Sequence, residues 1–488
     1  MRYHFNDSTL TDLQTSCLVV GVFKDGVSKL TQLNTDTEGH SQKLLENGDF
    51  SMGPGSTLLT YQMSGLKAER VIFVGLGETS LYTIQTLQKI SQSVIKKLGS
   101  SKITQISIAL DTFIGNDLAP TDVVKQLIVG FETQNYRYDQ KDQQKSRSEL
   151  QDITFITNDG DTLQDAARQT RAIAEGMRLT RYLGDLPANL CTPEVLASTA
   201  NELANDYDKI KTTILEEADA EKLKMGSFLS VAQGTDQPAK FIVMEYQQGQ
   251  KDAAPTVLVG KGVTFDSGGI SLKDSAKMDE MKYDMLGAAT VIGVFKAIAD
   301  MQLPINLIGL IPATENMPSG HATKPGDVFT SMSGQTIEII NTDAEGRLIL
   351  CDALTYAKQY KPKAVIDIAT LTGACIVALG RVPTGLFSNN AELTQQLVDA
   401  GHSSGDRVWE LPLWPEYSDS LKSSFADMKN TGGREAGSIT AAAFLSKFTE
   451  SYPWVHLDIA GTGWASGNTK GASGRPVPLL VEFLKHNG

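Results

Sequence analysis

The run TVLVGKGVTF at residues 256–265 continues directly into DSGG, so an apolar, β-branched stretch ends in a pair of glycines. Such a run predicts a strand, and the glycines after it predict a sharp turn. Lys261 and Asp266 then lie near the carboxyl end of the strand. Ligand sites in α/β sheets form at such ends, so residues 259–269 are the start of a candidate site.

Other apolar runs around this stretch alternate with helical patterns, which is typical of an α/β fold. The expected strands of this half are KFIVMEY (240–246), TVLVGKGVTF (256–265), INLIGLIPA (305–313), TIEIIN (336–341) and AVIDIATL (364–371). Thr192 and Pro193 have the pattern of an N-cap and a first helical position, and predict a helix to about residue 204. Together these elements predict a mixed or parallel sheet covered by helices on both faces.

The first 160 residues show the same alternation and predict a second α/β unit. Its expected strands are CLVVGVF (17–23), RVIFVGLG (70–77), ITQISIAL (103–110) and DITFIT (152–157). A chain of 488 residues exceeds the size of about 250 to 300 residues at which domains usually divide. We expect a smaller N-terminal α/β domain over 1–162, a connecting helix over 163–185 and a larger C-terminal α/β domain over 186–488. The polar stretch at 134–149 predicts an exposed loop.

The overall charge limits the partners of the chain. Lys and Arg number 44 against 57 Asp and Glu, which gives a net charge of −13. This mean field repels nucleic acid and anionic lipid, so we expect neither as a partner. No apolar run approaches the roughly 20 residues that span a bilayer, and the N-terminus lacks the pattern of a signal peptide, so we expect a cytoplasmic protein. The four cysteines form no C-x-x-C pair and predict neither a disulfide framework nor a thiolate metal site.

A second group of charged residues lies downstream of the glycine turn. Lys273 follows in the same loop, and Asp284 stands at the start of an apolar pattern (Ala288, Ile292, Phe295 and Ile298 or Ala299) that marks one face of a helix. Further on, Asp343 and Glu345 are two residues apart and would face the same side of an extended chain, with Arg347 close behind. Taken singly, each has an ordinary interpretation as a helix cap, a turn residue or a solvated charge. Their joint occurrence favours one site.

The six histidines include no H-E-x-x-H pattern and no tight cluster, so a metal would need other ligands. Carboxylates and lysines without histidine favour hard divalent ions such as magnesium or manganese, with zinc also a candidate. Carboxylates shared by two ions would hold them about 3.5 to 4 Å apart, as in co-catalytic hydrolases, and would turn a bridging water into hydroxide. A lysine that binds a metal must be neutral, which a neighbouring dication favours.

Several motifs resemble the leucine aminopeptidase, or cytosol aminopeptidase, family. They are VGKGVTFDSGG (259–269), KMDEMKYDM (277–285), ENMPSG (315–320), KPGDV (324–328) and the signature octapeptide NTDAEGRL (341–348), with further similarity to about residue 485. The resemblance implies a leucyl aminopeptidase that releases N-terminal residues from peptides. It also implies a smaller N-terminal α/β domain similar to the macro fold, a catalytic domain with a central mixed sheet, and assembly into a homo-hexamer.

The resemblance also implies roles for individual residues. Lys261, Asp266, Asp284 and Glu345 would hold one divalent ion, and Asp266, Asp343 and Glu345 the other, with manganese or zinc, or else magnesium, as the metal. Lys273 would polarise the scissile carbonyl and stabilise the oxyanion, and Arg347 would hold a bicarbonate ion that acts as general base. The pocket for the first side chain would be formed by Met281, Thr370, Gly373 and Ala460, while Leu371 would offer its backbone carbonyl to the substrate.

Three other functions stay open at this stage. A two-metal phosphoesterase would use the same kind of carboxylate cluster, and a regulatory protein could keep the fold without the activity. A secondary role in nucleic-acid binding would need a local basic patch. A dinucleotide loop at VGLGETS (74–80) is rejected because the third glycine of G-x-G-x-x-G is missing.

Overall fold

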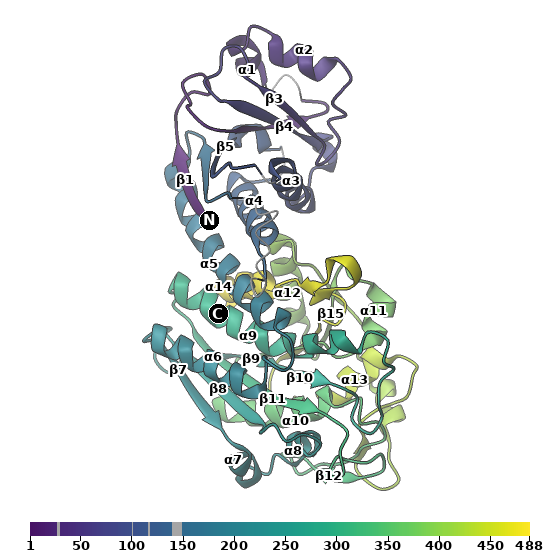
Figure 1. Ribbon diagram of the computed structural model, residues 1–488. Coiled ribbons are helices and arrows are strands. Elements are labelled where there is room, and N and C mark those ends of the chain that lie inside the picture. Colours follow the sequence, from purple (N-terminus) through teal and green to yellow (C-terminus); the bar gives the residue numbers. More distant parts are fainter. Residues whose placement is uncertain (27–29, 100, 116–117, 139–148) are drawn as a thin grey trace. The chain divides into compact units, whose positions relative to one another are not determined.

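The computed structural model describes residues 1–26, 30–99, 101–115, 118–138 and 149–488 (Figure 1). The chain divides into two compact units, Met1–Ala174 and Glu175–Gly488. The division falls inside α5 (Gly160–Asp185), the helix expected at 163–185. The domain boundaries at 162 and 185 stay a prediction. The polar loop expected at 134–149 lies largely outside the described residues, because only its first residues and its last are described.

In the first unit the described residues form a six-stranded sheet in the order β1-β6-β5-β2-β4-β3. Neighbouring strands are parallel except for β3, which is antiparallel to β4. The strands are β1 (Arg2–Asn6), β2 (Leu18–Phe23), β3 (Thr57–Tyr61), β4 (Arg70–Gly77), β5 (Gln105–Ala109) and β6 (Asp152–Ile156). The four predicted strands are confirmed. β1 and β3 escaped prediction because their residues are only partly buried, so neither is a continuous apolar run.

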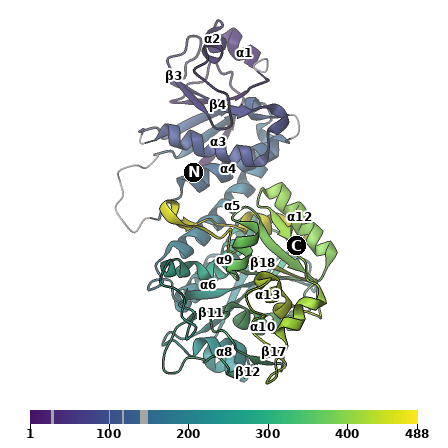
Figure 2. The same cartoon turned by 90° about the vertical axis from the view of Figure 1, so that its right-hand side faces the viewer.

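Helices cover this first sheet on both faces. They are α1 (Thr31–Asp36), α2 (His40–Glu46), α3 (Ile84–Leu98), α4 (Pro120–Asn135) and the first part of α5. α3 and α4 pack side by side (Figure 2). Val19 of β2 belongs to the core that includes α3 and α4, whereas its neighbours Leu18 and Val20 belong to a separate core with α1 and α2. The alternation along β2 therefore fills two cores, which confirms an α/β unit.

The second unit is built on a larger mixed sheet, nine-stranded within the described residues, in the order β16-β15-β18-β14-β9-β11-β8-β7 with β10 paired to β11. The strands β18, β14, β9, β11 and β10 are parallel to one another. The strands are β7 (Ile210–Leu215), β8 (Lys240–Gln247), β9 (Thr256–Gly260), β10 (Gly262–Asp266), β11 (Asn306–Asn316), β14 (Ala364–Ala369), β15 (Thr384–Ser388), β16 (Val408–Glu410) and β18 (Trp454–Asp458). Small sheets are formed by β12 (Val328–Thr330), β13 (Thr336–Glu338) and β17 (Met428–Lys429), and by β19 (Trp464–Ala465) and β20 (Gly471–Ala472).

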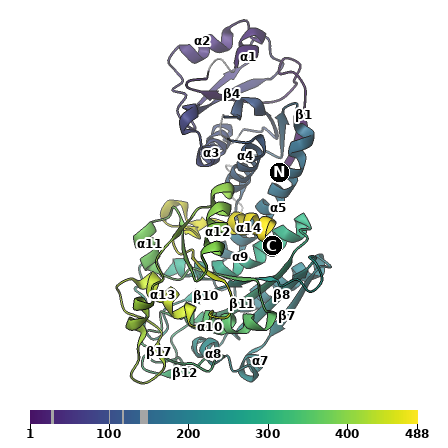
Figure 3. The same cartoon turned by 180° about the vertical axis from the view of Figure 1, so that it is seen from behind.

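Helices lie on both sides of the second sheet, as predicted. α6 (Pro193–Asp206) and α9 (Leu286–Met301) contact one face, while α8 (Gly226–Ala232) and α10 (Gly346–Ala357) contact the other. α14 (Val477–Asn487) packs on α9 (Figure 3). The remaining helices are α7 (Glu217–Lys222), α11 (Gly373–Leu379), α12 (Ala391–Ser404) and α13 (Gly437–Ser446), with 3₁₀ turns η4 (Met278–Met285), η5 (Lys358–Tyr360), η6 (Pro415–Leu421) and η7 (Gly467–Thr469). The central mixed sheet flanked by helices is therefore confirmed.

Three local predictions need correction. The run at 256–265 is two strands, since β9 pairs with β14 and β11, Lys261 follows it, and β10 then pairs, among the described strands, only with β11. The predicted single apolar face of α9 is too narrow, since nearly all of this helix is buried between the sheet and α14. β13 ends at Glu338, short of the predicted residue 341, because the chain then turns toward α10.

The helix predicted after Thr192 is confirmed, whereas the expectation of no thiolate metal site stays a prediction. All four cysteines are buried and unpaired. Thr192 is the N-cap residue of α6 and Pro193 its first residue, although no hydrogen bond from the Thr192 side chain caps the helix. Among the described residues, none of the helices combines the length and the apolar character that crossing a membrane requires.

Candidate metal and active site

The predicted site residues gather at one edge of the larger sheet. Because β9, β10, β11, β14 and β18 are parallel, their carboxyl ends meet at this edge. Lys261 follows β9, Asp266 ends β10, Thr370 follows β14, and Ala460 comes shortly after β18. The topology thus brings together residues that are far apart in the sequence.

Lys261 is held rigidly at the centre of the site. Its backbone is fixed between β14 and α9, since its carbonyl also accepts from Ala288 N at 2.8 Å. Its ammonium group contacts Asp284 Oδ2 and Glu345 Oε1, each at 2.8 Å, and only 3% of the side chain is exposed. A Cβ at Gly346 would lie 2.7 Å from the Lys261 Nζ atom, so the glycine leaves room for the ammonium. Lys261 therefore joins two carboxylates from different segments.

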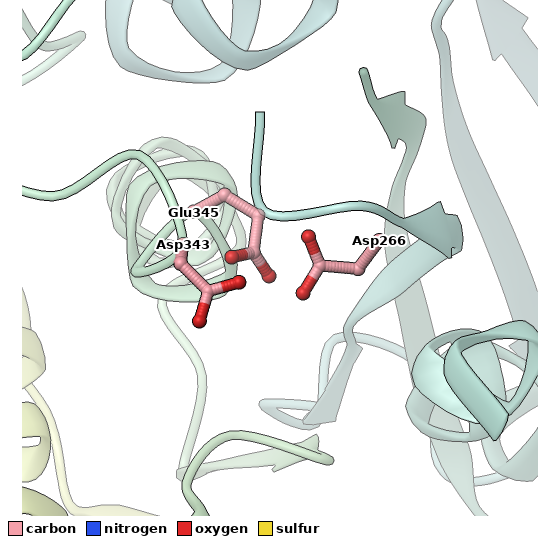
Figure 4. A group of neighbouring side chains, drawn as sticks. All are labelled: Asp266, Asp343 and Glu345. Atoms are coloured by element: carbon pink, nitrogen blue, oxygen red, sulfur yellow. The ribbon is translucent and has the colours of Figure 1, made fainter. Parts of the chain in front are cut away.

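Lys273 joins a second pair of carboxylates. Its ammonium lies 2.7 Å from Asp266 Oδ2 and 2.6 Å from Asp343 Oδ1. Asp266, Asp343 and Glu345 point toward one another (Figure 4), and one carboxylate oxygen from each lies within 4.8 Å of the other two. Asp343 and Glu345 converge in a turn at the start of α10, with Glu345 as its N-cap residue, so the predicted extended conformation is wrong although the convergence is right.

The electrostatics of the cluster reflect its burial. Burial raises the pKa of Asp266 to about 6, and the neighbouring Glu345 carboxylate adds to the rise. Burial likewise raises the pKa of Asp284 and that of Asp343. Burial opposes the ionised form of Glu345, but Lys261 and then Lys273 outweigh it and lower its pKa. A cation among these carboxylates would favour their ionised forms.

Both lysines are protonated in this arrangement. Burial disfavours the charge of Lys261, but the carboxylates of Asp284 and Glu345 outweigh it and raise its pKa. Burial also disfavours the charge of Lys273, but nearby carboxylates, Asp266 above all, outweigh it and raise the pKa of Lys273. The ammonium groups therefore occupy positions between carboxylates that a divalent cation would also favour.

Arg347 lies in the first turn of α10, where it is buried. It donates from Nη1 to Asn430 O at 2.9 Å, whereas its Nε has no hydrogen-bond partner among the described residues. Burial lowers the pKa of Arg347 to about 10, so the guanidinium is still charged near neutral pH. An unpartnered buried donor of this kind can accept an anion.

A cavity of about 400 Å³ connects all of these groups. The predicted site residues that line it are Lys261, Asp266, Lys273, Met281, Asp284, Asp343, Glu345, Arg347, Thr370, Leu371, Gly373 and Ala460. The size is sufficient for a small ligand. Thr370 also contacts the cluster directly, since its hydroxyl donates to Asp284 Oδ1 at 2.7 Å. Every residue that the sequence placed in the site is therefore in one cavity.

The residues of the site fit divalent cations. The donor set consists of carboxylate oxygens, which hard ions prefer, and one buried oxygen, Glu345 Oε2, has no hydrogen-bond partner among the described residues. Four carboxylates face the ammonium groups of Lys261 and Lys273, which leaves negative charge to be balanced. Burying ionised carboxylates without enough positive partners destabilises the folded protein, and a bound cation would offset this cost.

Some neutral residues of the site were not predicted, because neither the charge pattern nor the resemblance pointed to them. Trp464 lines the cavity and donates its indole N–H to the buried Glu280 at 3.0 Å. Asn430 is fully buried and donates to Asn341 O at 2.7 Å, which shapes the turn that leads to Asp343. Asn316 donates to Asp266 Oδ1 at 2.8 Å. Asn316 ends β11 and Trp464 begins β19, and a single uncharged side chain has no sequence pattern that distinguishes it, although Asn316 lies within ENMPSG.

Comparisons with known proteins agree with this geometry. The model of the cytosol aminopeptidase family, catalytic domain, matches residues 178–481, and that of its N-terminal domain matches 19–145. Probable cytosol aminopeptidases from Azoarcus sp. (strain BH72) and Aromatoleum aromaticum are each 52% identical to this chain, and each alignment covers 99% of this chain and 98% of the relative.

Solved structures give the same result for the fold. A mutant of tomato leucine aminopeptidase has a TM-score of 0.89 at 33% identity and covers 99% of this chain and 96% of its own. The bottromycin maturation enzyme BotP in complex with Mn has a TM-score of 0.84 at 30% identity, with coverages of 97% and 99%. The two-domain α/β fold is thus confirmed, while the likeness of the N-terminal domain to the macro fold stays a prediction. With both domains matched, the chain belongs to the cytosol aminopeptidase family and is a metal-dependent aminopeptidase.

Proposed function

We propose that this aminopeptidase is a leucyl aminopeptidase that releases leucine and other residues from the N-terminus of peptides by two-metal hydrolysis. The observation that carries the proposal is the cluster of Asp266, Asp343 and Glu345, of which Asp343 is partly exposed, in the wall of a cavity of about 400 Å³. Carboxylates shared between two ions are the usual basis of co-catalytic hydrolysis.

The proposed ligand sets are those that the resemblance to the family implies, and the convergence of the side chains supports them. One divalent ion would be held by Lys261, Asp266, Asp284 and Glu345, and the other by Asp266, Asp343 and Glu345. When bound, the ions would supply Lewis-acid activation of a water and of the scissile carbonyl. Manganese or zinc is the proposed metal, with magnesium as a third candidate, because carboxylates accept all three. Lys261 has to lose its proton to serve as a ligand, since an ammonium has no lone pair.

Two cationic side chains would act on the substrate directly. Lys273 is 22% exposed and can turn its ammonium from Asp266 and Asp343 toward a substrate carbonyl, where it would stabilise the oxyanion. Arg347 is proposed to hold bicarbonate as the general base, because its unpartnered Nε is a donor for an anion. The fixed backbone of α10 keeps Arg347 in place beside Glu345.

The remaining predicted residues would select the substrate. Asp284 would lie beside the free amino group, which limits cleavage to N-termini. Met281, Gly373 and Ala460, with Thr370, would surround the first side chain, and Leu371 would offer its carbonyl to the peptide backbone. All of them line the same cavity, which supports this assignment.

The cellular setting is also a proposal. We propose a cytoplasmic peptidase that assembles as a homo-hexamer and has neither membrane nor nucleic acid as a partner. The net charge of −13 supports the last point, because phosphate groups would be repelled.

The substrate class can be tested with three compounds: leucine p-nitroanilide, its N-acetylated form and phenyl phosphate. With manganese added, the chain is expected to cleave only the first, because a peptidase of the proposed kind requires the free amino group and acts on an amide bond. Equal cleavage of the acetylated compound would contradict the exopeptidase assignment. Cleavage of phenyl phosphate alone would instead support a phosphoesterase.

A further inference from the structure

Asp266 and Asn316 lie opposite each other at the ends of two neighbouring parallel strands. Along the pair, Val263 is opposite Thr314, and then Asp266 is opposite Asn316, so β10 uses one more residue than β11 over this step. This one-residue shift in register changes which side chain of β10 stands opposite Asn316, as extra residues in strands next to active sites do. Without the extra residue, Phe265 would stand opposite Asn316.

The amide of Asn316 holds the redirected carboxylate. Asn316 is 5% exposed, and its Nδ2 donates to Asp266 Oδ1 at 2.8 Å and to Thr342 O at 3.0 Å. Both partners can only accept, which determines the orientation of the amide. Asn316 therefore connects the end of β10 to the segment that leads into Asp343 and Glu345.

The glycine turn is also built around Asn316. Ser267 donates to the Asn316 carbonyl from its backbone N at 3.0 Å and from its hydroxyl at 2.7 Å. Gly268 N donates to Asp266 Oδ1 at 2.9 Å. Gly269 has a φ of +67°, and a Cβ there would lie 2.8 Å from Asn316 Oδ1. The DSGG sequence thus wraps closely around one asparagine.

The two carboxylate oxygens of Asp266 therefore differ in their hydrogen-bond partners. Oδ1 already accepts two hydrogen bonds, from Gly268 and Asn316, whereas Oδ2 contacts only the Lys273 ammonium among the described residues. We propose that Asn316 is a positioning residue that fixes Asp266 so that Oδ2 is the oxygen presented to the metal ions. This inference rests on the proposed metal site and adds a residue to it that binds neither metal nor substrate.

The alternative role of Asn316 is a simple link between backbone segments. Asn389 provides a comparison for this role, because it donates to Thr449 O and Tyr452 O and accepts from Trp454 N at 2.8 Å. Asn389 makes about as many side-chain hydrogen bonds as Asn316 and lies in the same unit, but it contacts no charged group of the cavity. Replacing it should reduce stability without changing the affinity for metal.

The test measures manganese affinity by calorimetric titration of the metal-stripped, full-length protein with manganese chloride. We compare the wild type with Asn316→Ala, with the similarly sized Asn316→Leu, and with Asn389→Ala as control. Loss of a side chain that orients a ligand typically weakens metal binding by about 10- to 100-fold, and we expect this in both Asn316 variants. The control should bind manganese as the wild type does, with a lower thermal midpoint.

The outcomes separate this inference from the proposed function. Wild-type affinity in a folded Asn316→Ala or Asn316→Leu protein would overturn the positioning role alone. A wild type that binds no manganese would overturn the proposed metal site and the positioning role together. Saturating manganese should restore kcat in Asn316→Ala to within a few-fold of wild type with KM unchanged, whereas a kcat that stays low at full occupancy would contradict a role limited to presenting Asp266.

Discussion

Two glycine-rich segments that continue from strands, VGLGETS and VGKGVTFDSGG, place their charged residues in different surroundings. After β4, the turn of VGLGETS places Glu78 and the nearby Lys24 in solvent, 50% and 60% exposed, in a loose contact of 3.6 Å. After β9 and β10, VGKGVTFDSGG places Lys261 and Asp266 in the interior, each 3% exposed. The spacing of glycines therefore predicts a turn, whereas the burial of charge identifies the site.

The energetics of the two turns explain this difference. An exposed pair such as Lys24 and Glu78 contributes about 0 to 1 kcal/mol, and solvent screens it. The buried pairs of Lys261 and Lys273 have lost their hydration, and breaking such a pair typically costs roughly 3 to 5 kcal/mol. Charges kept in the interior despite desolvation point to function.

The largest effect is expected when the buried cluster loses a shared carboxylate. Glu345→Ala should lower kcat/KM for leucine p-nitroanilide by more than about 10³-fold, which corresponds to about 4 kcal/mol. The reason is that Glu345 contacts Lys261 and is proposed to bind both metals. Glu482→Ala, which removes another buried glutamate far along the chain in α14, is the control and should keep most of the activity. Comparable losses in both variants would mean that burial alone explains the effect.

Lys273→Met tests the more exposed side of the same cluster. We expect kcat to fall by about 10²- to 10³-fold with KM little changed, because one oxyanion contact is lost. Manganese affinity should stay equal or increase, since the ammonium no longer contacts Asp266 and Asp343. Lys296→Met, which removes an ammonium paired with Asp300 on α9, should leave kcat within about 2-fold. Weaker manganese binding in Lys273→Met would argue against competition between ammonium and metal.

Asp352 shows what a buried acid without a site looks like. It accepts from Phe228 N and Met332 N, each at 2.8 Å, and burial raises its pKa from 3.8 to about 7. Between about pH 4 and pH 7 the folded protein keeps a proton that the unfolded chain releases, so stability falls as pH rises through this window and is constant above it. The free energy of unfolding should therefore be higher at pH 5 than at pH 8. We expect Asp352→Asn to remove roughly 2 kcal/mol of this difference.

Urea unfolding at pH 5 and at pH 8, monitored by tryptophan fluorescence, measures this difference in stability. The signal reports on the second unit, which contains Asp352 and all four tryptophans (Trp409, Trp414, Trp454 and Trp464). An unchanged pH dependence in Asp352→Asn would mean that Asp352 is ionised when folded. Activity at pH 8 should be retained, in contrast to Glu345→Ala.

The smallest effect is expected from a substitution beside the VGLGETS turn of the first unit. Asp25 accepts from Thr79 N at 3.0 Å and from the Thr79 hydroxyl at 2.8 Å, and both groups are exposed. Asp25→Ala should reduce stability by about 1 kcal/mol or less, measured by circular dichroism during unfolding, and should leave hydrolysis unchanged. A large loss of activity would show that this turn contributes to function after all.

The parts of the fold that could be predicted are those with continuous apolar runs. β4, β8, β11 and β14 are of this kind, whereas β18 is fully buried but carries His456 and Asp458. These polar residues are accommodated because His456 pairs with Asp367 of β14 and Asp458 accepts from Thr372 and from backbone N–H groups. Such compensation depends on partners that are distant in sequence, so the pattern of β18 alone could not reveal it.

The charged part of the site could be predicted because its residues cluster in a few motifs. The neutral residues that orient them could not, since Asn316 and Asn430 act through hydrogen bonds across loops. The convergence of Asp343 and Glu345 was predicted for the wrong reason, because the turn before α10 and not an extended strand brings them together.

The most direct test of the central claim is hydrolysis of leucine p-nitroanilide by the purified chain after its metal is removed. We predict that activity disappears on removal, returns with manganese or zinc, and does not return in Asp343→Ala. Hydrolysis that persists without metal, or equal recovery in Asp343→Ala, would contradict the claim that the buried carboxylates form a metal-dependent peptidase site.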